Sequence, residues 1–172
     1  MSKQSESMVL LPILLLAGCA SAPSVDVPEK LQPGSSETLA MIVPAKGVQI
    51  YECRAAKDGA YDWAFVAPEA ELFDASGKKI GKHYAGPHWE SADGSKIVGT
   101  TKERADAPAA NAIPWLLLSA KSDGPDGAFA SVTSVQRVHT AGGVAPKGCF
   151  EAEAGKRLRV GYTADYYFYT PD

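Results

Sequence analysis

The chain has 172 residues, a formal net charge of −3 and 22% charged residues. Its lysine and arginine residues are scattered and form no basic stripe, which argues against nucleic acid as a partner. A length of this order is typical of one folded domain.

The N-terminal segment has the features of a secretory signal. Lys3 precedes an apolar run from Met8 to Leu16, and small residues follow the run, as in signal peptides. The run is shorter than the about 20 residues that a membrane-spanning helix needs. It closes in Leu-Ala-Gly-Cys at positions 16–19, which resembles the lipobox of bacterial lipoproteins. The resemblance implies a signal peptide over residues 1–18 and acylation of Cys19.

The lipobox resemblance also implies a location. Several acyl chains on one cysteine anchor a protein stably to a membrane. Position 20 is alanine rather than aspartate, and in enterobacterial lipoproteins aspartate there favours the inner membrane. We therefore expect an outer-membrane anchor that faces the periplasm. Residues 19–36 are rich in Ser, Pro, Ala and Gly, which predicts a flexible tether before a domain over residues 37–172.

The domain has the pattern of an all-β protein. Runs rich in Val, Ile, Tyr, Phe and Trp alternate with clusters of Gly, Pro, Asp and Ser, which is typical of strands joined by turns. Asp58-Gly59 and Asp93-Gly94 suit hairpin turns that require positive φ. Ten strands are expected, near residues 38–43, 47–54, 62–67, 71–73, 79–84, 88–91, 96–103, 114–121, 132–140 and 162–169. They predict an antiparallel β-sandwich or a closed β-barrel with at most one or two short helices.

Side-chain alternation indicates which residues share a face. Along Gly47–Arg54, Gln49, Tyr51 and Cys53 lie on one side, because successive side chains of a strand point to opposite faces. Over residues 132–139, neither face is purely apolar. Both faces of that strand are therefore expected to make contacts.

The run Trp115–Leu118 leaves two alternatives open. It is either a central strand that is buried on both faces or the start of a short helix, since Pro114 suits the first position of a helix. Ala105–Ala112 has room for one helical turn.

Two cysteines remain once Cys19 is set aside. An oxidising periplasm favours a disulfide between Cys53 and Cys149. The alternative is a pair of buried free thiols. Their spacing excludes a Cys-x-x-Cys redox site, and two lone cysteines make a poor zinc site.

Four segments in order resemble one family. They are Gly81–Glu90, Ile113–Leu118, Val135–Gly143 and Tyr162–Tyr169, and together they resemble the DUF3455 family, a domain of unknown function in secreted bacterial and fungal proteins. The resemblance covers residues 37–170. His83, Gly86, Pro87 and Trp89 match its pattern, whereas His88 and His139 stand where the family has other residues. It implies no established activity.

The polar and aromatic residues of these segments form a candidate site for a ligand. They are His83, Tyr84, Trp89, Glu90, Asp93, Arg137 and His139. Imidazole and carboxylate groups are ligands of zinc and iron, so the candidate set for a divalent metal is His83, His88, Glu90 and His139. The alternative to a metal site is a structural role, in which Trp89 packs in the core and His83 hydrogen-bonds a buried carbonyl or carboxylate.

Arg137 lies in a predicted strand. A buried arginine is seldom left unpaired, and we expect an ion pair with Asp165 or Glu52. The alternative for Arg137 is an anion-binding site.

The sequence lacks the common catalytic motifs. It has no Gly-x-Ser-x-Gly nucleophile elbow and no strand–GxGxxG–helix unit for a nicotinamide cofactor, and no cofactor is expected. Aromatic residues are abundant, including Tyr166–Tyr169, of which one alternating pair is predicted in the core and the other half exposed. We expect an envelope lipoprotein with a binding or structural domain, whose partner is a small molecule, a glycan or an envelope protein. A small metal-dependent or acid–base enzyme centred on His83, Glu90, Asp93 and His139 is the alternative.

Overall fold

The computed structural model describes residues 26–172 and shows an all-β protein, as predicted. The predicted signal peptide, Cys19 and the first part of the tether lie outside the described residues. Eight strands and two short 3-10 helices follow in the order η1 (Glu29–Leu31), β1 (Glu37–Ala55), β2 (Tyr61–Phe73), β3 (Lys79–Tyr84), β4 (His88–Ser91), β5 (Lys96–Ala105), β6 (Trp115–Ser122), β7 (Ser134–Gly142), η2 (Glu151–Glu153) and β8 (Arg157–Pro171). Among residues 26–172, no helix has the length and apolar character needed to cross a membrane.

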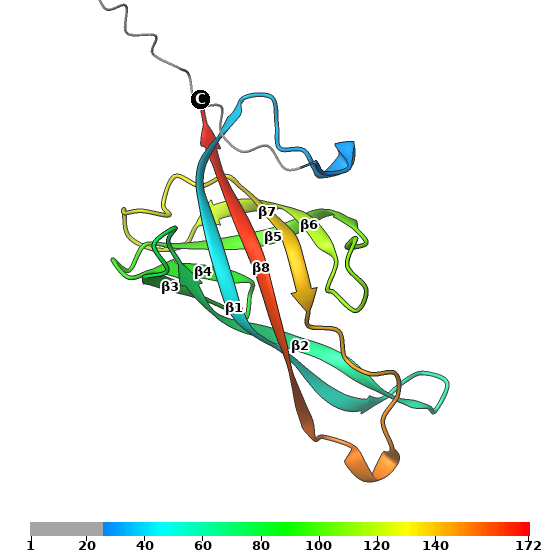
Figure 1. Cartoon of the computed structure of the whole chain (residues 1–172). Helices are drawn as coiled ribbons and strands as arrows, with labels where there is room; N and C mark the ends of the chain where they lie inside the picture. Colours follow the sequence, from blue (N-terminus) through cyan, green and yellow to red (C-terminus); the bar gives the residue numbers. More distant parts are fainter. Residues whose placement is uncertain (1–25) are drawn as a thin grey trace, which may run out of the picture.

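The strands form a closed barrel in sequence order. Each strand pairs antiparallel with the next, and β8 pairs with β1 to close the sheet. These two long strands lie side by side in Figure 1. Closure pairs every strand with two neighbours, although the start of β1 and most of β2 are paired on one side only. Of the two architectures that the sequence left open, the barrel is the one observed.

Four of the expected strands are joined in pairs in the structure. The strands expected at residues 38–43 and 47–54 are both part of β1, and those expected at 62–67 and 71–73 are both part of β2. Strand β1 runs through Pro44, and β2 runs through Pro68, although proline cannot donate to a sheet. Pairing of β1 with β2 begins only at Ala45, and pairing of β2 with β3 begins only at Ala70. Each proline therefore lies where its strand is paired on one side, and no backbone N–H is needed on the other side.

The barrel interior holds the main apolar core. Alternating residues of β8, including Tyr166 and Phe168, point inward and are fully buried. Phe129, from the connection between β6 and β7, lies at one end of the barrel with its ring 5.0 Å from that of Phe168. Leu118 faces the same interior while Leu117 is buried on the outer side. The run from Trp115 is therefore the doubly buried strand, not a helix.

A second apolar cluster lies outside the barrel, under the N-terminal segment. Leu31 is completely buried against Trp115, Leu117, Val138 and Tyr167, and its carbonyl oxygen accepts a 2.6 Å hydrogen bond from Gln136. The folded part thus begins before residue 37, earlier than the sequence indicates. Of the two alternating pairs in Tyr166–Tyr169, one was expected to be half exposed; this segment covers Tyr167 of the outer pair, whereas Tyr169 is partly exposed.

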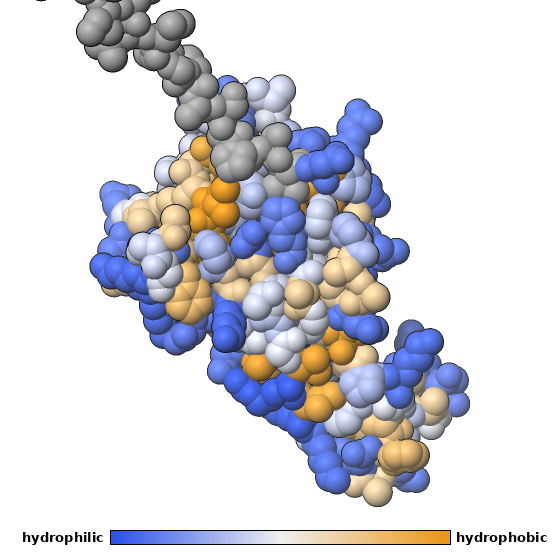
Figure 2. All heavy atoms as spheres, viewed as in Figure 1, coloured by the Kyte–Doolittle hydropathy of each residue, from blue (hydrophilic) through white to orange (hydrophobic). Residues whose placement is uncertain are grey.

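The long hairpin of β1 and β2 projects beyond the barrel together with the start of β8 and with η2 (Figure 1). Cys53 of β1 forms a disulfide with Cys149 of the β7–β8 connection, as predicted. The Cys149 amide donates to the Tyr61 carbonyl at 3.1 Å, so the disulfide ties this connection to the hairpin. Polar residues cover most of the face seen in Figure 2, with small apolar patches near the base of the projection.

Residues 26–172 contain all eight strands, both apolar clusters and the disulfide. They therefore include the contacts that hold the fold together, and we expect residues 26–172 to fold on their own.

Candidate functional site

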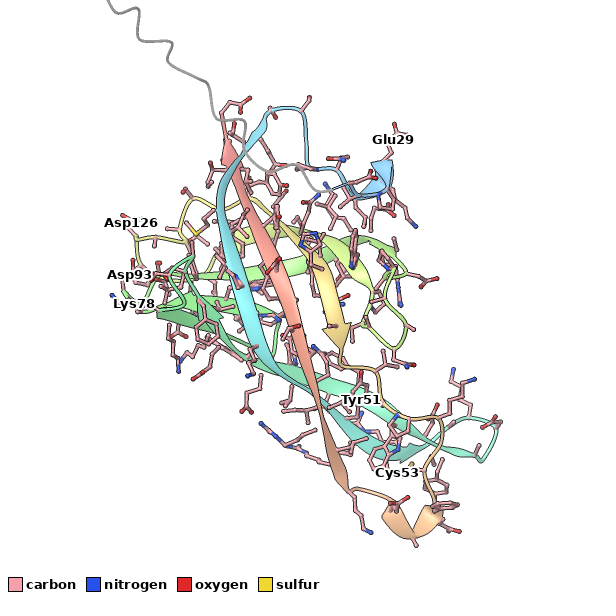
Figure 3. The ribbon with its side chains drawn as sticks, in the orientation of Figure 1. Glu29, Tyr51, Cys53, Lys78, Asp93 and Asp126 are labelled. Carbon is pink, nitrogen blue, oxygen red and sulfur yellow. A yellow bond between two sulfur atoms is a disulfide. The ribbon has the colours of Figure 1, made fainter. Side chains whose placement is uncertain are left out.

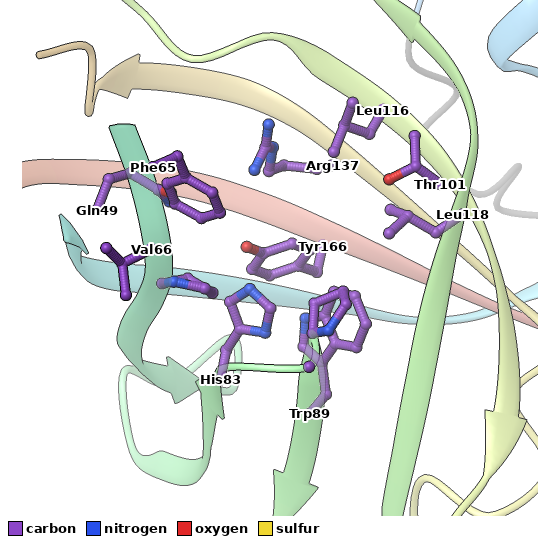
Figure 4. Close-up of a pocket in the computed structure, with 13 residues that line it drawn as sticks. Gln49, Phe65, Val66, His83, Trp89, Thr101, Leu116, Leu118, Arg137 and Tyr166 are labelled. Carbon is purple, nitrogen blue, oxygen red and sulfur yellow. The ribbon is translucent and has the colours of Figure 1, made fainter. Parts of the chain in front are cut away.

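One end of the barrel, beside the β3–β4 connection, contains a cavity of about 240 Å³. Figure 4 shows its walls, which combine apolar side chains with a few polar ones. A second hollow of about 360 Å³ adjoins the cavity and shares five lining residues with it, Gln49, Phe65, Thr101, Leu116 and Arg137. The two form one opening into the barrel.

His83 lies on the floor of this cavity and is only 3% exposed. Its Nδ1 donates to the carbonyl of His88 at 2.8 Å, which leaves Nε2 without a proton in the neutral ring. The ring stacks on Trp89 with 4.5 Å between centroids. Burial lowers the pKa of His83 to about 3, so the imidazole is neutral near pH 7. The predicted hydrogen bond to a buried carbonyl and the predicted core position of Trp89 are both observed.

Arg137 points into the same cavity from β7, opposite Tyr166 of β8. Its Nε and Nη2 donate to the Pro114 carbonyl at 3.1 and 2.8 Å. Burial raises the pKa of the Tyr166 hydroxyl, and the nearby positive charge of Arg137 acts against that rise.

The predicted ion pair of Arg137 is wrong. Asp165 pairs with His139 at 2.9 Å, and Glu52 pairs with Arg54 at 2.8 Å. Asp165 directly precedes Tyr166 in the strand, and Glu52 alternates with the inward-facing Tyr51, so both carboxylates point away from the interior. Among the described residues, no carboxylate forms an ion pair with Arg137.

Gln49 is the site residue that sequence reasoning missed. It lines both hollows, is 2% exposed, and its Nε2 has no hydrogen-bond partner among residues 26–172. A buried amide donor without a partner costs free energy. Alternation places Gln49 beside Tyr51 and Cys53 on the inward face, and a polar residue on that face is the signal that could have found it.

Glu90 and Tyr84 lie together on the outside of the barrel. The Tyr84 hydroxyl donates to Glu90 at 2.7 Å, and the Lys82 ammonium lies 3.1 Å from the same carboxylate. These contacts hold the pKa of Glu90 below its usual value, and the bond to the carboxylate raises the pKa of Tyr84 to about 12. His88 is bound instead to the Ala85 carbonyl and to Asp123.

Asp93 has a structural role in the β4–β5 turn. It accepts hydrogen bonds from the backbone amide and hydroxyl of Ser95, at 2.9 and 2.6 Å, and from the Ala128 amide at 2.8 Å. These bonds hold its pKa well below the usual value. They also tie the turn to the β6–β7 connection.

The predicted metal ligands His83, His88, Glu90 and His139 are not brought together. His83 lies inside the barrel, whereas Glu90 and His139 bind partners on the outside. Within the part of the chain that the structure describes, no group of three or more His, Cys, Asp or Glu side chains is placed to hold a metal ion. The four residues of the predicted acid–base set do not meet either: His83 lies inside the barrel, whereas Glu90, Asp93 and His139 have separate partners elsewhere. Of the predicted cluster, His83, Trp89 and Arg137 remain at the cavity.

Comparison with known proteins agrees with the motifs. The profile of the family described as "Protein of unknown function (DUF3455)" matches residues 33–170. No curated protein and no solved structure matches the chain. Because the family profile covers most of its length, the chain belongs to the DUF3455 family.

Proposed function

We propose that the protein is a lipid-anchored protein of the bacterial cell envelope whose barrel binds a small molecule in its open end. The observation that carries the binding proposal is the cavity, in which, among residues 26–172, the buried Nε2 of Gln49 has no hydrogen-bond partner and Arg137 forms no ion pair with a carboxylate. Ligand sites in proteins are concave, mostly apolar and supplied with a few polar groups that fix orientation. A bound molecule would satisfy these polar groups.

The shape of the site favours a small molecule over a glycan or a protein. The cavity of about 240 Å³ lies within the barrel, below a mouth at which Phe65 is 53% exposed. An exposed large aromatic side chain at a hollow is typical of a contact surface for an apolar ligand. The Leu116 and Leu118 side chains continue this apolar wall inward.

Blocking the mouth tests the binding proposal. Thr101 is exposed and lines both hollows, so we expect Thr101→Trp to fill the opening while leaving the core unchanged. The neutral fluorophore N-phenyl-1-naphthylamine serves as the probe. Residues 26–172 should enhance its fluorescence on titration, and the variant should lose about tenfold or more in affinity.

Thr100→Trp is the matched control, because Thr100 is the exposed neighbour of Thr101 in β5 and lines neither hollow. The control should bind the fluorophore like the unaltered protein. Equal binding by both variants, or no fluorescence enhancement by the unaltered protein, would contradict a ligand site in the barrel.

Acylation of Cys19 tests the anchoring proposal. We expect the full-length protein, made in a Gram-negative host supplied with an alkyne fatty acid, to take up the label, and Cys19→Ala to abolish uptake because the acylated atom is removed. Ser21→Ala is the control and should keep the label. Labelling that persists in Cys19→Ala would show that this cysteine is not the lipid attachment site.

A further inference from the structure

The lining of the open end is unbalanced in charge. Arg137 lies in the cavity and Arg104 at the adjoining hollow, while neither hollow is lined by an aspartate or glutamate. His83 adds no charge there, because its buried ring is neutral. The site therefore presents positive charge and no negative charge to whatever enters.

One edge of the Arg137 guanidinium is bound to the Pro114 carbonyl, and the other edge faces the Tyr166 hydroxyl and the cavity. Nε and one Nη2 hydrogen are directed at the Pro114 carbonyl, which leaves Nη1 and the second Nη2 hydrogen among its five donors. Two parallel N–H groups on one edge match the two oxygens of a carboxylate. The bond to Pro114 also fixes the direction in which this edge points.

Gln49 supplies a second donor at the same cavity. Its Nε2 has no hydrogen-bond partner among residues 26–172, and the residue is only 2% exposed. Figure 4 shows Gln49 and Arg137 at the cavity together with Tyr166. A donor and a cation without an acidic partner are complementary to an anion.

The remaining walls of the cavity indicate that the part of the ligand away from its charge is apolar. Trp89, Leu118 and Phe65 provide flat or apolar surface around the polar groups. Apolar area removed from water contributes to binding in proportion to its size. A hydrophilic inorganic ion would leave these walls without a partner.

We propose that the cavity binds a small organic carboxylate with a flat apolar body, its carboxylate paired with Arg137 and assisted by Gln49. This inference rests on the proposed binding function and specifies the class of ligand. It also explains why the arginine of β7 has no acidic partner in the barrel.

A matched pair of compounds tests the charge requirement. 2-Naphthoate and 2-naphthamide share one ring system and differ in charge at one group, and each is titrated calorimetrically into residues 26–172. We expect 2-naphthoate to bind about tenfold more tightly or better, since a hydrogen-bonded charge pair in a partly buried site has that effect. High salt should weaken the binding of 2-naphthoate alone.

Arg137→Gln should abolish this preference while N-phenyl-1-naphthylamine still binds, which shows that the cavity persists. Arg54→Gln is the control, because Arg54 is exposed and paired with Glu52 outside the cavity.

Gln49→Leu is a second variant that keeps the charge of Arg137. It should weaken 2-naphthoate several-fold without lowering the melting temperature, because it replaces an unpaired buried amide with an apolar group.

Each alternative outcome separates the two proposals. Equal affinities for the two naphthalene compounds, or a preference that survives both Arg137→Gln and Gln49→Leu, overturn the carboxylate inference. So does the absence of binding by both compounds. In each of these cases, binding of N-phenyl-1-naphthylamine at the mouth would still support the proposed binding function. If the fluorophore does not bind either, the proposed binding function is also wrong.

Discussion

Cys53→Ser is expected to lower the free energy of unfolding of residues 26–172 by about 2–4 kcal/mol. The disulfide joins residues separated by 96 positions, so its loss releases a long loop in the unfolded chain. Figure 3 places Cys53 in the projection beyond the barrel, where fewer core residues hold the chain. Urea denaturation followed by circular dichroism measures the change.

The reducing agent dithiothreitol provides the control for this prediction. It should destabilise the unaltered protein by a similar amount and leave Cys53→Ser unchanged, because the variant has no disulfide to reduce. If the reduced and oxidised proteins unfold at the same urea concentration, the disulfide does not stabilise the fold.

Leu31→Ala should destabilise the protein by about 2–5 kcal/mol, although Leu31 lies before the first strand. Its side chain is fully buried in the outer cluster with Trp115 and Tyr167, and truncation would leave a cavity there. Lys30→Ala, at the exposed neighbouring position of η1, should change stability by no more than about 0.5 kcal/mol.

Both variants are compared by urea denaturation. If Leu31→Ala unfolds at the same concentration as Lys30→Ala, the N-terminal segment does not stay packed on the barrel in solution. A large loss for Leu31→Ala alone would establish this segment as part of the folded domain.

Local patterns in the sequence predicted most of the secondary structure. The period of two placed Gln49, Tyr51 and Cys53 on one face, and the structure confirms that Gln49 and Cys53 are buried. The strands at Lys79–Tyr84 and His88–Ser91 have the predicted bounds. These features depend on neighbours in the sequence, which is why they can be predicted from it.

The choice between a β-sandwich and a closed β-barrel depends on pairing between strands that are distant in the sequence. Whether the first and last strands meet determines barrel or sandwich, and no local pattern encodes that contact. Pro44 and Pro68 look like strand breaks, yet each is tolerated where its strand has a partner on one side only. The composition of residues 19–36 predicts a tether, and a single leucine between Lys30 and Gln32 gives no local sign that its side chain is buried.

The candidate site was predicted in part. His83, Trp89 and Arg137 were singled out and line the cavity, but the partner proposed for Arg137 was wrong. Choosing that partner required knowing which residues of other strands face inward. Gln49 was missed because a lone glutamine forms no motif, and only the three-dimensional structure shows that its Nε2 has no hydrogen-bond partner among residues 26–172.

The pairing of β1 with β8 closes the barrel, and it requires both the first and the last strand of the domain. It pairs Glu37 with Pro171 and Glu52 with Arg157, from opposite ends of the domain. Such distant pairing slows folding, because the chain must close a long loop before the contacts form. The barrel cannot close until the last 15-residue strand has been synthesised. A chain made from its N-terminus therefore keeps the barrel open until β8 is available to pair with β1.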